Sequence, residues 1–142
     1  MLTTDRLELA AGLDRLATLL PRLTPRGGLS LVAAATLADL ERRGARRITE
    51  LADTQGVTQP AMTGLVGRLA AGGLVERAPD PADRRGVLVT VTPEGRAVLA
   101  ARRRARAEAL ADLLDGLDAD DRAALAAAMG AVSRLVSKGT PA

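Results

Sequence analysis

Apolar residues recur at helical spacing along most of the chain, a pattern that predicts a mainly α-helical protein. Near the start, leucines spaced by four and three residues predict one apolar face of a helix over residues 1–22. Pro21, Pro25 and Gly27 predict the end of this helix and a loop. The apolar face suits either a core or a subunit interface, and an interface is favoured because the later elements do not require this helix. The leucines are Leu9, Leu13, Leu16 and Leu20.

Two shorter helices are predicted next. Ser30 is expected to cap a helix over residues 31–42, because its hydroxyl can accept a free N–H of the first turn. Thr49 is expected to begin a helix over residues 50–55, after an extended link at Ile48. The positions predicted to face the core are Val32, Ala35, Leu40, Leu51 and Ala52.

A fourth helix, over residues 58–71, is predicted with the clearest boundaries. Thr58 can cap it, Pro60 falls in the first turn where its missing N–H costs nothing, and Gly72 supplies the stop. Its apolar face is Met62, Leu65, Val66 and Leu69. Its opposite face carries Gln59, Thr63, Gly64, Gly67 and Arg68. Such a short, polar and basic face suits a helix that enters the major groove of DNA, and the short link before it predicts a helix-turn-helix.

A β-hairpin is predicted directly after this helix, over residues 74–91. Pro79 and Gly86 interrupt two runs with strand propensity, so we expect a rigid loop between them that carries Arg84 and Arg85 at its tip. The expected strands cover residues 74–78 and 87–91, with the loop at 79–86. A helix-turn-helix followed by a hairpin with arginines at its tip is a winged helix.

Two long helices are predicted to complete the chain. Thr92 is expected to cap a helix over residues 93–114, which includes an arginine run at 102–106 expected to lie in water. Asp118 is expected to cap the last helix, with fraying from Ser137 onward. The predicted apolar positions are Val98, Leu99, Leu110, Leu113 and Leu114 in the former helix and Leu125, Ala128, Met129, Val132, Leu135 and Val136 in the latter.

Composition restricts the chemistry of the chain. It has no cysteine and no histidine, which excludes disulfides, thiol catalysis and Ser-His-Asp hydrolysis and removes the usual ligands of zinc and copper. We therefore expect no metal, no cofactor and no enzymatic activity. It also has no aromatic residue, so its core must be built from Leu, Val, Ala and Met. Such a core buries little area per residue, and we expect subunit association to contribute to stability.

Charge and hydropathy indicate the partners. The net charge is only +3, so nucleic acid would bind only if the arginines gather on one face. No apolar stretch approaches the length of a membrane span, and no signal segment is visible, so the protein is expected to be soluble and cytoplasmic.

Together these motifs resemble the MarR family of bacterial transcriptional regulators over nearly the whole chain. The order and spacing of the motifs make the likeness specific, although each motif alone is weak. The segments that carry it are Ile48 to Ala52, Val57 to Pro60, Gly73 to Arg77, Asp80 to Arg85 and Val91 to Gly95.

The resemblance implies a homodimer that binds a near-palindromic operator in double-stranded DNA, usually as a repressor released by a small ligand. It implies one MarR-type domain over residues 1–138, with dimerisation helices at about 1–22 and 93–137, a winged helix-turn-helix at about 30–92 and a tail at 139–142. The implied DNA-binding residues are Thr58, Gln59, Pro60, Thr63, Gly64 and Arg68 in the recognition helix and Asp83, Arg84 and Arg85 in the wing.

The resemblance also gives these residues roles. Arg85 is expected in the minor groove, where guanidinium groups are attracted to the negative potential, with Asp83 steadying it and Arg84 pointing toward phosphate. The chain departs from the family at Gly64, where arginine is common, and at Gly67, where an acid is common.

Two further expectations concern partners. An effector, if there is one, is expected to be an organic acid held in an aliphatic pocket by an arginine. The alternative function is a winged helix used as a protein-interaction module within a larger assembly, against which the basic tip of the wing argues.

Overall fold

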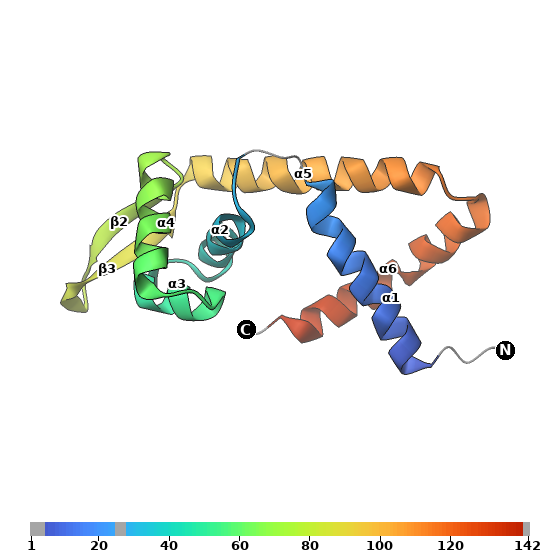
Figure 1. The fold of residues 1–142 in the computed structure, drawn as a ribbon, viewed down its shortest axis with the longest axis horizontal. Helices are drawn as coiled ribbons and strands as arrows, with labels where there is room; N and C mark the ends of the chain where they lie inside the picture. Colours follow the sequence, from blue (N-terminus) through green and yellow to red (C-terminus); the bar gives the residue numbers. More distant parts are fainter. Residues whose placement is uncertain (1–4, 25–27, 141–142) are drawn as a thin grey trace. The chain divides into compact units, whose positions relative to one another are not determined.

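The computed structural model describes residues 5–24 and 28–140. Within these ranges it has six α-helices, one short 3-10 helix and one three-stranded sheet, which confirms a mainly α protein with a small hairpin wing (Figure 1). The chain divides into two compact units, Met1–Arg106 and Ala107–Ala142. The predicted loop residues Pro25 and Gly27 lie outside the described residues, as do residues 1–4 of the predicted first helix and 141–142 of the predicted tail.

The first helix, α1 (Arg6–Leu19), continues into a 3-10 helix, η1 (Leu20–Leu23). The carboxylate of Asp5 accepts the backbone N–H of Leu7 at 3.4 Å and caps α1. The α-helical ladder ends just before Pro21, which has no N–H to continue it. Helix α1 buries none of its residues within the single chain, so its leucines do not pack in a core there.

Helix α2 (Leu31–Arg43) begins where the sequence predicts, because Ser30 Oγ accepts the backbone N–H of Ala33 at 3.1 Å. The predicted inward face is wrong in part, since Val32 and Ala35 are exposed and Leu40 is buried. The observed inward face includes two polar residues. Because polar residues are normally assigned to the surface, the apolar residues alone do not show which side of the helix faces the core. The buried residues are Ala33, Thr36, Leu37, Asp39 and Leu40.

The third helix starts earlier than predicted. Strand β1 (Arg46–Arg47) precedes α3 (Ile48–Gln55), so Ile48 is helical and not part of an extended link. Thr49 does not cap the helix, because the N-cap position falls on Arg47. The Glu50 carboxylate accepts the backbone N–H of Arg47 at 3.2 Å and so fixes the turn from strand to helix.

Helix α4 (Gln59–Ala71) confirms the bounds predicted for the fourth helix, 58–71, almost to the residue. Thr58 Oγ1 accepts the backbone N–H of Ala61 at 3.3 Å, and Gly56 before it adopts a left-handed conformation that ends α3. The apolar face of α4 packs with α2, α3 and the sheet in one core. The largest fully buried apolar side chains of that core are Leu37, Leu40, Leu51, Met62, Val66 and Val89.

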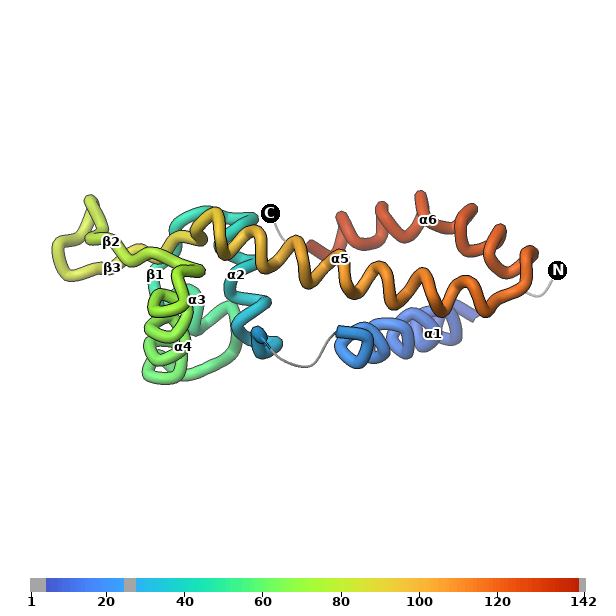
Figure 2. Tube along the Cα trace, turned by 90° about the horizontal axis from the view of Figure 1, so that it is seen from above, coloured from blue at the N-terminus to red at the C-terminus, as the bar shows by residue number. Residues whose placement is uncertain are grey.

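The wing is a longer hairpin than predicted. Strands β2 (Val75–Asp80) and β3 (Asp83–Val91) pair antiparallel across a turn at residues 81–82, so the loop predicted over 79–86 is wrong. Pro79 is tolerated opposite Val87 because β2 is an edge strand in the order β1-β3-β2, where a missing N–H need not break the sheet. The hairpin extends away from α2, α3 and α4 in both views (Figures 1 and 2).

Helix α5 (Pro93–Asp115) is capped as predicted by Thr92, whose Oγ1 accepts the backbone N–H of Gly95 at 3.0 Å. Its predicted apolar face is only partly buried, because Leu99 is buried but Val98, Leu113 and Leu114 are exposed. The arginine run over 102–106 is not only a solvent-exposed surface of the helix, as was predicted. Arg102, Arg103 and Arg106 bond groups of the same unit: the Leu29 carbonyl at 3.2 Å, the Glu41 carboxylate at 2.8 Å and the Thr24 hydroxyl at 3.3 Å.

The last helix, α6 (Ala119–Gly139), is capped by Asp118, whose carboxylate accepts the backbone N–H of Asp121 at 2.8 Å. The helix continues through Ser137 and Lys138 to Gly139, so it ends two residues later than predicted. No residue of α6 is buried in the single chain, although its predicted apolar stripe is present. Among the described residues, no helix is long and apolar enough to cross a bilayer.

Candidate nucleic-acid interface

The exposed face of α4 carries the predicted recognition residues. Gln59, Pro60, Gly64 and Arg68 are all exposed, because the apolar residues between them face the core. Thr58 and Thr63 are exposed as well, although each hydroxyl already makes a backbone hydrogen bond, and the Thr63 hydroxyl donates to the Gln59 carbonyl at 2.9 Å. Hydroxyl, amide and guanidinium groups of this kind can read base edges in the major groove.

The Arg68 side chain lies close to the position that a side chain at Gly64 would occupy. A Cβ built at Gly64 would lie 3.6 Å from the Arg68 Nη1 atom, so the Arg68 guanidinium lies back along the helix over this glycine. A positive charge therefore lies near Gly64, the position where arginine is common in the family and where this chain has no side chain. Nothing lies within 4 Å of a Cβ built at Gly67, which is open.

The wing places two exposed arginines beside one carboxylate. Asp83 Oδ1 accepts the backbone N–H of Arg85 at 3.0 Å, which fixes the start of β3, and the side chains of Arg84 and Arg85 are exposed. Arg85 and Gln59 line the same cleft of about 270 Å³. The structure thus brings a residue of the recognition helix and the predicted wing arginine to one surface.

Arg47 and Asp80 form an ion pair that the sequence analysis did not predict. Arg47 Nε donates to Asp80 Oδ2 at 2.8 Å, and Arg47 Nη2 contacts the same oxygen. Asp80 Oδ1 accepts the backbone N–H of Ala82 at 2.9 Å. The Ala82 hydrogen bond, followed by the Arg47 pair, holds the pKa of the Asp80 carboxyl below its usual value, so this acid stays ionised at neutral pH. The two residues are 33 positions apart, and no local sequence signal links them.

A second charge cluster, also missed from the sequence, surrounds the buried Asp39. Its carboxylate is 3.2 Å from both Arg42 Nη2 and Arg43 Nε and 3.6 Å from Arg46 Nη1. Arg46 also contacts the Glu50 carboxylate at 2.9 Å. The pKa of Glu50 is lowered, first by the backbone N–H of Arg47 and then by the Arg46 side chain. The cluster joins α2 to β1 and α3, and its arginines are engaged within the protein.

The described residues offer no metal site, because they contain no group of three His, Cys, Asp or Glu side chains that could hold an ion.

Comparison with known proteins decides the family. A sequence profile of the MarR family matches residues 27–86. An HTH-type transcriptional regulator of Mycobacterium tuberculosis is 36% identical over 131 residues, which cover 92% of each chain. The chain belongs to the MarR family. It is therefore a DNA-binding transcriptional regulator of this family.

Other known proteins are similar to this chain in sequence or in fold. The HTH-type transcriptional repressor NicR of Pseudomonas putida is 39% identical over 71 residues, half of this chain and 45% of NicR. The regulator Tm0710 of Thermotoga maritima has a TM-score of 0.75 at 22% identity, covering 94% of this chain and 97% of its own. BpsR of Bordetella bronchiseptica, whose DNA binding is regulated by 6-hydroxynicotinic acid, has a TM-score of 0.56 at 27% identity. The match covers 88% of this chain and 95% of the BpsR chain.

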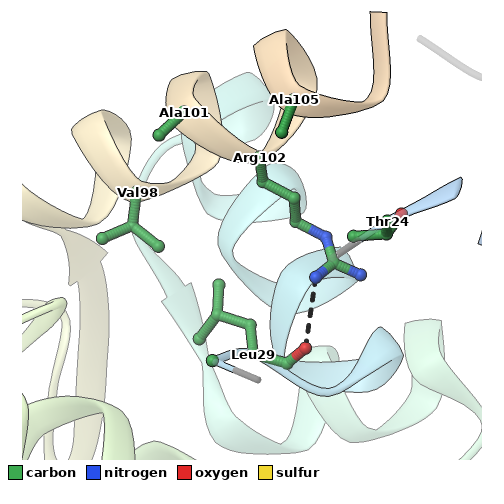
Figure 3. Close-up of a pocket in the computed structure, with 7 residues that line it drawn as sticks. Thr24, Leu29, Val98, Ala101, Arg102 and Ala105 are labelled. Carbon is green, nitrogen blue, oxygen red and sulfur yellow. Dashed lines mark hydrogen bonds between the residues drawn. The ribbon is translucent and has the colours of Figure 1, made fainter. Parts of the chain in front are cut away.

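This MarR-type chain also has a cavity of about 210 Å³ beside α5 (Figure 3). Arg102 extends from α5 and donates through Nη1 to the Leu29 carbonyl at 3.2 Å. Among the described residues, the buried Nε of Arg102 has no hydrogen-bond acceptor. An unsatisfied buried guanidinium N–H favours an anionic or carbonyl ligand. The lining residues are Thr24, Gly28, Leu29, Val98, Ala101, Arg102 and Ala105.

Proposed function

We propose that this protein is a homodimeric repressor that binds a palindromic operator and is released by a small organic acid. The recognition helix over residues 58–71 would enter the major groove, and the wing over 74–91 would reach the adjacent minor groove. The observation that carries this proposal is the shared cleft, where Gln59 of the recognition helix and Arg85 of the wing meet on one exposed surface.

The polar groups on that surface suit the two grooves. Gln59 and Thr63 can pair with base edges, and Arg68 adds positive charge for a phosphate. Arg85 is presented at the wing with its backbone N–H bonded to Asp83, which supports a minor-groove role for its guanidinium. Arg84, next to it and also exposed, is assigned to phosphate.

Exposed apolar faces support dimerisation. On α6, four large apolar side chains are between 42% and 60% exposed, and on α1 Leu9 and Leu16 are 58% and 48% exposed. A contiguous apolar stripe of this kind is unfavourable in water and marks an interaction surface. We assign the dimerisation region to helices at about 1–22 and 93–137, as the family resemblance implies. The four residues of α6 are Leu125, Met129, Leu135 and Val136.

Two-fold symmetry would then fix the operator. The recognition helices of a dimer lie about 34 Å apart when they read successive major grooves on one face of the duplex. The operator is therefore expected to be palindromic, with half-sites spaced by about one helical turn.

The cavity beside α5 is the proposed effector site. Its lining is aliphatic except for Thr24 and the Arg102 guanidinium, which suits a carboxylate on a small body. Its volume of about 210 Å³ is below the range typical of drug-sized ligands, so the effector should be small. BpsR, which responds to 6-hydroxynicotinic acid, provides a relative with a ligand of this class.

The decisive experiment measures operator binding of the Arg85→Ala variant. Duplexes selected by the wild-type protein from a random pool serve as probes, and affinity is measured over a series of salt concentrations. Loss of the guanidinium should weaken binding by about 5- to 150-fold, by analogy with the roughly 1–3 kcal/mol of a specific base contact. Arg96→Ala, which removes an exposed arginine at the start of α5, is the matched control and should bind nearly as the wild type does. Equal affinity of Arg85→Ala and wild type would exclude the wing role.

A further inference from the structure

The ion pair between Arg47 and Asp80 spans the small sheet from one edge to the other. Arg47 lies in β1 and is paired with Leu88 of β3, whereas Asp80 is the last residue of β2 and is paired with Asp83. Because β3 is the central strand, the Arg47 side chain reaches across it to the far strand. The Asp80 side chain is only 7% exposed, so this contact is shielded from water on its acidic side.

The tip of the wing is built around this carboxylate. Asp80 Oδ2 receives Arg47, and Oδ1 accepts the backbone N–H of Ala82 in the turn. Gly86 leaves the room that the carboxylate fills, because a Cβ there would lie 3.2 Å from Asp80 Cβ and 3.3 Å from Asp80 Oδ2. Both strands of the hairpin are therefore packed against one acid whose counterion comes from outside the hairpin.

The hairpin needs such an attachment. A two-stranded hairpin alone is marginally stable in water, and β1 adds only a two-residue strand, which pairs with Leu88 and Val89 well below the tip. Within the described ranges, no side chain outside the hairpin other than Arg47 makes a hydrogen bond or ion pair with residues 80–86.

We propose that the Arg47–Asp80 pair is the tether that positions Arg85 for DNA. Arg47 is a positioning residue in this assignment, and its charge is used inside the protein. The cleft supports the assignment, since Arg47, Gln59 and Arg85 all line it, so the tether lies between the two DNA-reading elements. The inference rests on the proposed minor-groove role of Arg85.

The Asp80→Asn variant distinguishes a positioning role of the ion pair from a simple effect of net charge, because the two predict opposite changes in DNA affinity. Removing a negative charge and freeing Arg47 should strengthen DNA binding if only net charge matters. If the pair positions the wing, binding to the duplex selected by the wild type should weaken about tenfold. Asparagine keeps an oxygen for the Ala82 N–H, so the turn is preserved. Glu76→Gln, which removes an exposed acid from the same strand, is the matched control and should bind as tightly as wild type or slightly tighter.

A double-mutant comparison with Arg85→Ala tests whether the pair acts through that residue. In the Arg85→Ala background, Asp80→Asn should cost little more, because the side chain that it positions is already gone. Equal or tighter binding by Asp80→Asn, or an undiminished loss in the double variant, would overturn the tether. Failure of the wild type to select any duplex would instead overturn the proposed function.

A second pair of variants covers the case in which Asp80→Asn does not fold, as judged by circular dichroism. Arg47→Met should bind more weakly than Arg47→Lys, because lysine keeps one charged hydrogen bond to Asp80. The slope of log affinity against log salt gives a further readout. If Arg47 contacted a phosphate directly, Arg47→Met would reduce the magnitude of this slope by about 0.9 in both the wild-type and the Arg85→Ala backgrounds, and that result would contradict the positioning role.

Discussion

Gly95 is the position where the structure predicts the sharpest loss of stability from the smallest change. A Cβ built there would lie 2.2 Å from the Leu74 carbonyl oxygen and 2.8 Å from Val91 Cγ2, whereas real Cβ atoms essentially never come closer than 3.0 Å. The Leu74 carbonyl cannot simply move, because it accepts the backbone N–H of Thr92 at 3.1 Å. The Thr92 hydroxyl in turn donates to the Gly73 carbonyl at 2.6 Å.

The magnitude follows from these contacts. In Gly95→Ala the chain must separate by at least 0.8 Å, from 2.2 to 3.0 Å, at a junction that is closed by hydrogen bonds. Overpacking typically costs about 1–3 kcal/mol, and losing the bond from Thr92 to Leu74 adds about 0.5–1.5 kcal/mol. The better helix propensity of alanine returns at most about 1 kcal/mol. We expect a net loss of about 2 kcal/mol, or roughly 4–8 °C in melting temperature.

Urea unfolding of Gly95→Ala and Gly67→Ala at one protein concentration tests this expectation. Gly67 is the matched control, because it also lies within a helix but has nothing within 4 Å of a built Cβ. There the same substitution should stabilise by up to about 1 kcal/mol. If both variants shifted in the same direction by similar amounts, the close approach of Gly95 to Leu74 would not govern stability, and the reasoning would fail.

Three further predictions concern pH, assembly and the effector. The pKa values of Asp80 and Glu50 lie below their usual values, so their contribution to stability is complete above the unfolded-state pKa of about 4 and is lost as pH falls through the folded values. Urea titrations should therefore show stability falling below about pH 4, and less steeply in Asp80→Asn. Leu135→Glu should convert the proposed dimer to a monomer in sedimentation velocity, because it places a charge in the apolar stripe of α6. If the cavity beside α5 is the proposed effector site, 6-hydroxynicotinic acid, the compound that regulates BpsR, should raise the melting temperature of the wild type but not of Arg102→Met, and a neutral amide analogue should raise neither.

The elements that the sequence predicts best are those whose boundaries are set locally. The start of α4 depends on Thr58 and Pro60, and its end depends on Gly72, all within a few residues of the bonds they make. The caps at Ser30 and Asp118 are local in the same way. Cap and turn chemistry can therefore be read without knowledge of the rest of the fold.

The inward face of α2 was mispredicted because its buried polar residues find their partners in ways that the local pattern conceals. The Thr36 hydroxyl donates to the Val32 carbonyl of its own helix at 2.8 Å. Thr36 is therefore buried without losing a hydrogen bond. Asp39 is buried among arginines, one of which, Arg46, lies beyond the end of the helix. From the sequence alone, an acidic residue is predicted to lie at the surface, because the arginines that compensate its charge cannot be identified without the fold.

The wing loop was predicted too long for a related reason. Pro79 and Gly86 disfavour strand structure locally, but pairing with the central strand overrides that preference. The structure also allows both residues, since Pro79 lies on an edge strand and Gly86 lies where a larger residue would press on Asp80. Local propensity failed here because the competing interactions come from across the hairpin.

The two acids of the wing show why a list of DNA-facing residues understates what a wing requires. Asp80 and Asp83 look equivalent in the sequence, yet Asp83 is exposed and bonds the backbone of Arg85, whereas Asp80 is buried. A buried carboxylate is stable only when its charge is compensated, and here the compensation comes from Arg47, which belongs to the strand that leads into the helix-turn-helix. Because the buried Asp80 of the wing needs the charge of Arg47, the wing is linked to the segment that leads into α3 and α4. A substitution at Arg47 or Asp80 should change DNA binding as much as one at the proposed groove-facing residues, although the buried Asp80 would not be chosen from the exposed surface alone.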